Sequence, residues 1–261
     1  MTTFGDVEVI VHDDGVAIVE LRRPEENFFD IELIRCLADA YDALDDDPRC
    51  RAIVLCSMGR HFCAGADLSR PSLGPPADGG PWGAADLYTA AARLIDAKTP
   101  VVAAVQGAAI GGGLGLACSA DFRVASTQAR FAANFARLGF HHGFGLTVTL
   151  PMIVGHQHAC DLLYSGRRVT GEESLAIGLC ERVVGPDELR NAAHHRAATI
   201  AACAPLAVRS IRSTMRAGLS ERFRAATDHE FAEQDRLRRT SDFAEGVRAA
   251  AERREPRFEG R

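Results

Sequence analysis

Three consecutive glycines, Gly111 to Gly113, are the residues best placed to do backbone chemistry. They follow a short apolar run, Val101–Val105, and precede further apolar residues from Leu114 onward, which predicts a buried strand, a tight turn and a buried helix. Because glycine lacks a Cβ atom, a ligand atom can approach the main chain closely. The first N–H groups of a helix have no partner within the helix and favour negative charge. This corner could therefore bind a phosphate or stabilise an oxyanion formed in a reaction.

Three interpretations of the glycine corner compete. A glycine-rich turn can serve only the close packing of a helix on a strand. A dinucleotide-binding fingerprint would need a third glycine after Gly113 and Gly115, where the chain has Cys118 instead. An oxyanion hole would need a second N–H donor from elsewhere in the chain.

A second corner, in which a buried strand is again followed by a loop of small residues, lies earlier in the chain. The apolar strand Ala52–Cys56 is followed by the loop Gly59–Leu68, in which Ala64, Gly65 and Ala66 would let a ligand touch the backbone. If the two corners face each other, they supply a pair of N–H donors for one oxygen atom. Spacing along the chain does not by itself show that they do.

Composition narrows the class of protein. The chain has 261 residues and a formal net charge of -5, with 47% hydrophobic and 25% charged residues, which is ordinary for a globular protein and excludes a largely disordered one. The acidic balance gives no reason to expect a nucleic-acid partner. No apolar run reaches the roughly 18 residues of a membrane span, and no signal peptide is visible. We therefore expect a cytoplasmic protein with no membrane partner.

The cysteines point to the same compartment. None of the eight forms a C-x-x-C pair and several lie in apolar runs, so we expect reduced core cysteines. Cys63 borders the second corner and is an alternative candidate as a nucleophile. The eight are Cys36, Cys50, Cys56, Cys63, Cys118, Cys160, Cys180 and Cys203.

The apolar pattern predicts alternating strands and helices as far as Val184 and only helices from Pro186 onward. The chain is thus divided into an α/β core of residues 1–185 and a helical region of residues 186–261. Within the core, the Pro- and Gly-rich segment Ser69–Gly83 predicts a mobile surface loop or lid. The expected strands are Val7–Val11, Val16–Leu21, Ala52–Cys56, Val101–Val105, Phe122–Ala125, Arg130–Ala133 and Leu179–Val184. Among the expected helices are one capped by Asp30 and closed by a solvated Asp45–Asp47 turn, Ala84–Ala97, Leu146–Val154, Leu219–Thr240 and one capped by Ser241.

Taken in order, several segments resemble the enoyl-CoA hydratase/isomerase, or crotonase, family. They are FCAGADL (Phe62–Leu68), VVAAVQGAAIGGGLGLACSADFRVAS (Val101–Ser126), SGRRVTGEESLAIGLCERVV (Ser165–Val184) and the tail FEGR (Phe258–Arg261). The resemblance covers nearly the whole chain in register. It implies a spiral of ββα turns with a C-terminal helical trimerisation region, and trimers or dimers of trimers. It also implies an acyl-CoA thioester substrate, with coenzyme A as part of the substrate and no metal or separate cofactor.

The resemblance also assigns site residues. The oxyanion donors would be the backbone N–H groups of Ala66 and Gly112, and such preorganised donors are each worth about 3 kcal/mol of barrier. Coenzyme A would pass near Arg23 and Asn27 and then along Ala64, Asp67 and Leu68. The candidates for its phosphates, which could equally be solvated surface charges, are Arg22, Arg23, Arg253 and Arg254.

The sequence departs from the family at its acid–base pair. A hydratase of this family uses two glutamates, because adding water across a double bond needs an acid and a base. The matching positions here hold Gly115 and Phe135. His141 and His142 lie in the glycine-flanked turn that follows and could move a proton instead, or they could bond a loop carbonyl.

Weaker candidates for the proton carrier are His61 and Tyr88. The pair His156 and His158 does not share a helix face, so no metal site is expected there. An aromatic cluster suggests either an apolar acyl pocket or simply a core. It consists of Phe131, Phe135, Phe140 and Phe144.

The leading functional hypothesis is an enoyl-CoA hydratase or isomerase that polarises the thioester carbonyl with Ala66 and Gly112. Two alternatives stay open. One is a crotonase-type hydrolase that cleaves a C–C or thioester bond, which needs only an oxyanion hole and one base. The other is an acyl-CoA binding protein that has lost catalysis, as the residues at positions 115 and 135 suggest.

Overall fold

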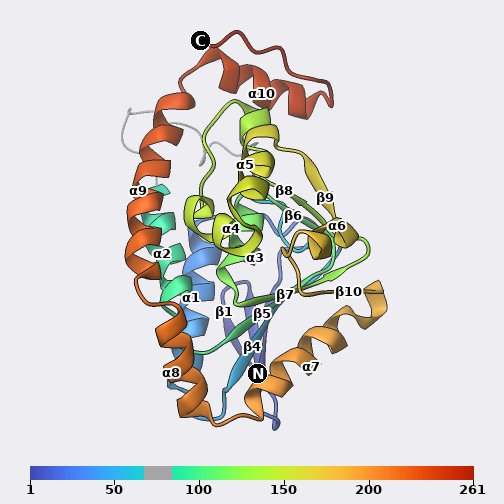
Figure 1. Ribbon diagram of the computed structural model, residues 1–261, viewed down its shortest axis with the longest axis vertical. Coiled ribbons are helices and arrows are strands. Elements are labelled where there is room, and N and C mark those ends of the chain that lie inside the picture. Colours follow the sequence, from blue (N-terminus) through green and yellow to red (C-terminus); the bar gives the residue numbers. More distant parts are fainter. Residues whose placement is uncertain (68–83) are drawn as a thin grey trace.

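The computed structural model describes residues 1–67 and 84–261. Its centre is a seven-stranded sheet in the order β1-β2-β3-β4-β5-β7-β10, antiparallel from β1 to β3 and parallel from β3 onward (Figure 1). The strands are β1 (Thr2–Phe4), β2 (Val7–Val11), β3 (Val16–Leu21), β4 (Ala52–Ser57), β5 (Val101–Val105), β7 (Phe122–Ser126) and β10 (Arg182–Val184). A smaller sheet joins β6 (Ala108–Ile110), β8 (Arg130–Ala132) and β9 (Arg168–Thr170).

Helices cover both faces of the large sheet, which explains why every residue of β4 and β5 is buried. Successive side chains of a strand point to opposite faces. Ile53 and Leu55 accordingly belong to the main core under α1 (Ile31–Asp46), while Ala52 and Val54 pack with α7 (Leu189–Ala201). The last predicted core strand ends at Val184, but α7 lies on the sheet, so the helical region is not a detached unit.

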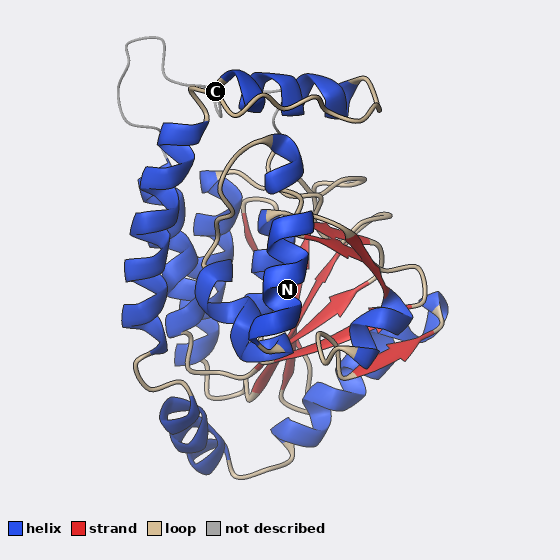
Figure 2. Cartoon of the chain, turned by 45° about the horizontal axis from the view of Figure 1, so that its top comes forward, coloured by secondary structure: helices blue, strands red, loops and turns tan. Residues whose placement is uncertain are grey.

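The remaining helices frame the main core. Helix α9 (Leu219–Leu237) runs along one edge beside α2 (Ala84–Asp96), and α10 (Ser241–Ala251) closes the end of the molecule away from α8 (Pro205–Met215) (Figure 2). The others are α3 (Gly112–Ser119), α4 (Leu146–Val154), α5 (His156–Ser165) and α6 (Gly171–Ala176).

Several local predictions are confirmed. Asp30 caps α1 by accepting a hydrogen bond from the Leu33 N–H at 2.9 Å. The predicted strands Val7–Val11 and Val16–Leu21 form β2 and β3 with the same bounds. Elements with a clear apolar periodicity can therefore be predicted from the sequence.

Other local predictions are wrong. Asp45 is only 8% exposed and accepts bonds from the Lys98 and Thr99 N–H groups, so it ties α1 to the start of β5 rather than facing solvent. Thr240, not Ser241, caps α10. The prediction of core cysteines holds for six of the eight, but Cys160 is half-buried and Cys203 is exposed.

Candidate functional site

The two glycine-rich corners meet. The loop after β4 pairs with β6 through the parallel bridge of Cys63 with Ala109. The Cys63 N–H donates to the Ala108 carbonyl at 3.0 Å, and the Ile110 N–H donates to the Cys63 carbonyl at 3.1 Å. The loop that carries Ala66 is thereby fixed to the strand that leads into α3.

Two glycines allow this close approach. A Cβ atom on Gly113 would overlap the carbonyl oxygen of Cys63, and one on Gly65 would lie 2.7 Å from the carbonyl oxygen of Ile110. Gly65 also has a φ of +90°, which side chains rarely adopt. Two of the small residues singled out in the sequence are therefore required where the corners touch.

The backbone N–H groups of Ala66 and Gly112 belong to residues that line one cavity. Gly112 is the first residue of α3, so its N–H has no acceptor within the helix. Across residues 1–67 and 84–261, no hydrogen bond uses either N–H. Two residues of the cavity lining thus carry N–H groups that have no acceptor within the described part of the chain.

The cavity has a volume of about 150 Å³ and a mainly apolar wall. Phe29 and Phe144 form an aromatic pair at its donor end, with ring centroids 5.4 Å apart. Phe135 and Phe140 form a second pair at the same separation. Three members of the predicted aromatic cluster thus line the cavity, whereas Phe131 is buried in the core.

The space beside Gly115 is filled by Phe144. A Cβ atom on Gly115 would lie 2.6 Å from the Cβ and 2.9 Å from a ring carbon of Phe144. Phe144 is 1% exposed and has a φ of +61°, which is uncommon for a bulky residue. An aromatic ring therefore occupies the place from which a side chain at position 115 would extend, and Phe135 fills the other position where the resemblance expects a glutamate.

Polar groups enter the cavity from α2 and α9. The Tyr88 hydroxyl donates to the Gln234 side-chain oxygen at 3.0 Å, and the Gln234 amide donates to the His141 carbonyl at 3.1 Å. Burial raises the pKa of Tyr88, which keeps the phenol neutral. One helical turn after Gln234, Arg238 also lines the cavity, with its guanidinium carbon 5.2 Å from the centre of the Phe140 ring.

The structure does not bring His141 or His142 into the cavity wall. The His141 Nδ1 lies 2.8 Å from the His142 carbonyl, and the His142 Nε2 lies 2.8 Å from the Thr147 hydroxyl. Burial, together with the nearby His141 and His229, lowers the pKa of His142 to about 4. This imidazole is neutral at pH 7 and cannot then act as a general acid.

The predicted proton-carrier turn is instead held by a buried carboxylate. Glu230 on α9 accepts from the Gly145 N–H at 2.8 Å and the Thr147 N–H at 3.0 Å, at the start of α4. Burial raises the pKa of Glu230, although the hydrogen bonds from Gly145 and Thr147 act to lower it. Glu230 fixes the turn that carries Phe144, and the sequence reasoning did not identify it.

Among the predicted substrate-binding residues, Ala64 and Phe135 line the cavity. Asn27 is fully buried and donates to the Met58 and His61 carbonyls, each at 2.7 Å, so it braces the loop and offers no surface to a ligand.

The other two predicted binding residues of the described chain are placed differently. Arg23 pairs with Asp6 at 2.5 Å and with Asp30 at 2.8 Å, and neither Arg23 nor Asp67 lines the cavity. Leu68 and the predicted loop Ser69–Gly83 lie outside the described residues.

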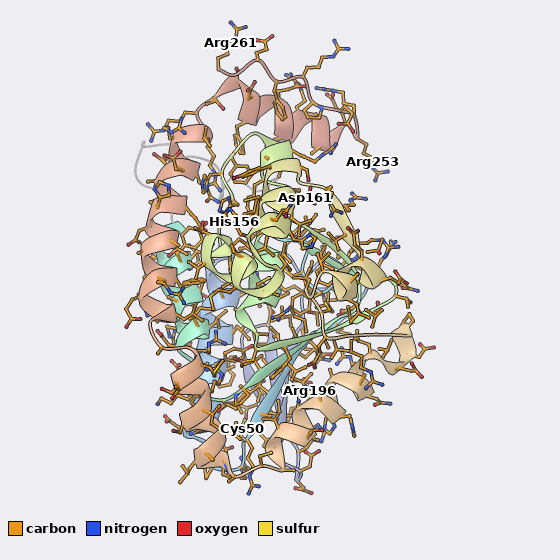
Figure 3. All side chains as sticks on the ribbon, viewed as in Figure 1. Cys50, His156, Asp161, Arg196, Arg253 and Arg261 are labelled. Carbon is orange, nitrogen blue, oxygen red and sulfur yellow. The ribbon has the colours of Figure 1, made fainter. Side chains whose placement is uncertain are left out.

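Further candidates from the sequence are the nucleophile Cys63 and the phosphate-binding arginines Arg22, Arg253 and Arg254. Burial raises the pKa of the Cys63 thiol to about 12, which excludes it as a nucleophile at neutral pH. Arg22 pairs with Glu8, Arg254 pairs with Glu245 at 2.5 Å, and the Arg253 side chain lies at the periphery (Figure 3). Among the described residues, no group of three His, Cys, Asp or Glu side chains could hold a metal ion, and no helix is long and apolar enough to cross a membrane.

Gln234 and Arg238 are site residues that sequence reasoning missed. They lie more than a hundred positions after the glycine corner, Gln234 in the charge-rich helix α9 and Arg238 directly after its last residue. Their spacing of four residues places both on one face of α9, but nothing in the chain marks that face as a cavity wall.

Comparisons with known proteins agree with this architecture. A model of the family described as enoyl-CoA hydratase/isomerase matches residues 12–261. The carnitinyl-CoA dehydratase of Salmonella arizonae is 35% identical over 249 residues, covering 93% of this chain and 94% of that protein. That of Proteus mirabilis is 34% identical over 268 aligned residues, covering 100% of this chain and 98% of that protein. The crystal structure of an enoyl-CoA hydratase/isomerase from Pseudoalteromonas atlantica superimposes with a TM-score of 0.85 at 30% identity, covering 97% of this chain and all of that one. The predicted crotonase-like α/β fold is thereby confirmed.

Proposed function

Because the chain belongs to the enoyl-CoA hydratase/isomerase family, we propose that it acts on an acyl-CoA thioester whose carbonyl oxygen lies between the N–H groups of Ala66 and Gly112. The observation that carries this proposal is the meeting of the two corners at one cavity. Preorganised N–H donors in a site that excludes water stabilise negative charge as it develops on the thioester oxygen. The reaction would pass through such an enolate or tetrahedral oxyanion, with coenzyme A as part of the substrate and no separate cofactor.

The reaction type proposed first is the addition or elimination of water, or the shift of a double bond, next to the thioester. The relatives from Salmonella and Proteus are named dehydratases, which supports a lyase-type reaction. Within the described lining there is no glutamate or histidine, and Asp30, its one carboxylate, pairs with Arg23. Any hydration here must therefore use an acid–base arrangement other than a pair of glutamates at positions 115 and 135.

That same observation supports a second candidate. With Phe144 beside Gly115 and Phe135 in the wall, the site supplies oxyanion donors without a carboxylate pair. A hydrolase of a C–C or thioester bond, or a silent acyl-CoA binding protein, would fit such a lining. The experiment that separates the candidates is mass spectrometry of enoyl-, β-hydroxy- and β-keto-acyl-CoA panels incubated with the protein in H₂¹⁸O.

Each outcome of that experiment has one meaning. Gain or loss of water without cleavage supports a hydratase or dehydratase, and cleaved products that carry ¹⁸O support a hydrolase. A shifted double bond, seen as deuterium uptake from D₂O, supports an isomerase. Binding with no change of any kind supports the silent binder, and no binding of any thioester contradicts the proposal as a whole.

We further propose a homotrimer or a dimer of trimers in the cytoplasm. Helix α8 supports this assembly, because it carries large apolar side chains that are largely exposed in the single chain and would be covered by another copy. These are Leu206, Ile211 and Met215. A monomeric mass by light scattering would contradict the assembly.

A further inference from the structure

The end of strand β8 brings an amide side chain to the glycine corner. Strands β6 and β8 run parallel with Ile110 opposite Ala132, and the Gly111 N–H donates to the Ala132 carbonyl at 2.8 Å. Because parallel strands leave a sheet at the same edge, the residues just after Ala132 lie beside those just after Ile110. Asn134 is the second residue after β8, and Gly112, whose N–H is a proposed oxyanion donor, is the second residue after β6.

The Asn134 side chain reaches the residue that precedes this donor. A Cβ atom on Gly111 would lie 3.3 Å from the Asn134 Oδ1. A carbon–carbon single bond is about 1.5 Å long, so this Oδ1 lies within about 5 Å of the Gly111 Cα. Asn134, Gly111 and Gly112 all line the cavity. The amide is therefore beside the part of the cavity in which the thioester carbonyl would be held.

Asn134 differs in its hydrogen bonds from other polar residues of the described lining. Tyr88 donates to Gln234, whose amide donates to a main-chain carbonyl. Asp30 caps α1 and forms an ion pair. The half-buried Asn134 side chain, in contrast, takes part in no hydrogen bond within the described part of the chain. Its amide is thus free to bond a ligand, and a few such polar groups in an apolar pocket fix the orientation of what binds there.

The chemistry of an amide defines the ligand group that suits it. The amide oxygen accepts hydrogen bonds and the amide nitrogen donates them, and a hydroxyl group can do both in return. An enolate held at the thioester oxygen releases or gains a hydroxyl group at carbon 3, the second carbon from the carbonyl. A hydroxyl group at carbon 3 is close enough to the carbonyl to meet an amide that lies beside Gly111.

From this juxtaposition we propose that Asn134 binds the hydroxyl group at carbon 3 of a 3-hydroxyacyl group and selects its configuration. The inference rests on the proposed acyl-CoA function and names a substrate-binding residue of that same site. An amide held at a fixed place beside the carbonyl donor meets the hydroxyl group of only one enantiomer. Asn134 holds this group without transferring a proton, so it does not replace the glutamates that are absent from positions 115 and 135.

The test compares ligands that differ by one hydroxyl group. Calorimetric dissociation constants are measured for each enantiomer of 2,2-difluoro-3-hydroxyhexanoyl-CoA and for 2,2-difluorohexanoyl-CoA. Fluorine replaces both hydrogens of carbon 2, so these ligands cannot lose water, and mass spectrometry of the recovered ligand checks that each is unchanged. A six-carbon acyl group suits a cavity of about 150 Å³, which is the size that holds benzene.

The wild-type protein should bind one hydroxylated enantiomer about three- to tenfold more tightly than the ligand without a hydroxyl group, as expected for one neutral hydrogen bond. Asn134→Leu keeps a side chain of similar size and removes the amide, so it should abolish this preference. Asn134→Ala removes the amide without adding apolar bulk and should give the same result. Asn191→Leu is the matched control, because Asn191 is exposed on α7, and it should leave the preference unchanged.

Three results would overturn the inference and leave the acyl-CoA function standing. They are a hydroxyl preference that survives in either folded Asn134 variant, equal affinity of the wild-type protein for the two enantiomers, and binding of hexanoyl-CoA without binding of either enantiomer. Failure to bind hexanoyl-CoA and all three fluorinated ligands would contradict the acyl-CoA function itself, and this inference with it.

Discussion

The close packing of Phe144 against Gly115 predicts how much stability a methyl group at position 115 should cost. Gly115→Ala places a methyl group 2.6 Å from the Cβ of Phe144, and carbon atoms pack best at about 3.5–4.0 Å. One of the two must move by about 1 Å, and Phe144 is confined by its contact with the Phe29 ring. Overpacking of this kind costs about 1–3 kcal/mol of the free energy of unfolding.

Removing the side chain of Phe144 should reverse the effect of that methyl group. Phe144→Gly alone should cost about 3–5 kcal/mol, because it leaves a cavity in the core, and glycine adopts the φ of +61° at this position without strain. In that background Gly115→Ala no longer meets the Cβ or the ring, and alanine is favoured over glycine in a helix by about 1 kcal/mol. The double variant should therefore be more stable than the sum of the single effects by about 1–3 kcal/mol.

Urea unfolding of the four proteins measures this coupling, and Gly113→Ala serves as the control. A methyl group at Gly113 meets the carbonyl oxygen of Cys63, which Phe144→Gly does not relieve, so these two changes should add. Additivity of Gly115→Ala and Phe144→Gly within about 0.5 kcal/mol would refute the placement of Phe144 in the space beside Gly115.

Three further predictions follow from buried polar groups. Burial alone would raise the pKa of Asp121, but Arg212 and Arg216 outweigh it and lower that pKa. The stability from this carboxylate should thus be full above about pH 4 and lost as the pH falls below it, and Asp121→Asn should cost about 3–5 kcal/mol in urea unfolding at pH 7. Glu230→Gln should cost about 1.5–3 kcal/mol in the same assay, since it removes charge-assisted bonds to the start of α4, and an unchanged midpoint would contradict that role. His142→Gln should reduce kcat less than tenfold from pH 6 to 8, whereas loss of a general base costs about 10²–10⁴-fold and would restore the histidine hypothesis.

The sequence predicted the parts of the site that depend on local chemistry. Strand, glycine turn and helix are recognisable from Val101 to Leu116, because apolar runs and glycines act over a few residues. The sequence could not predict that the two corners face each other. That arrangement depends on the three-residue strand β6, which is too short to show an alternation of apolar and polar residues.

Residues that join distant elements escaped prediction for a related reason. Arg238 and Glu230 look like members of a solvated, charge-rich helix, and only the packing of α9 places the first in the cavity and the second under α4. His141 and His142 were judged by their position in the chain, near Phe135. Their environment, which lowers the pKa of His142, is a tertiary property.

The most direct test of the central claim concerns the Gly112 N–H. Proline is well tolerated at the first position of a helix and lacks an N–H group, but a Cβ atom on Gly112 would overlap the ring of Phe29. The comparison is therefore between Phe29→Ala and Phe29→Ala/Gly112→Pro, both with hexanoyl-CoA labelled with ¹³C at the thioester carbonyl. The infrared carbonyl stretch of bound ligand reports how strongly the donors polarise it. We expect a shift to lower frequency on binding to Phe29→Ala that largely disappears in the double variant, together with a loss of kcat of about 10²–10³-fold for the thioester that the mass-spectrometry panel identifies as a substrate. An equal shift and equal turnover in the two folded proteins would contradict the oxyanion hole.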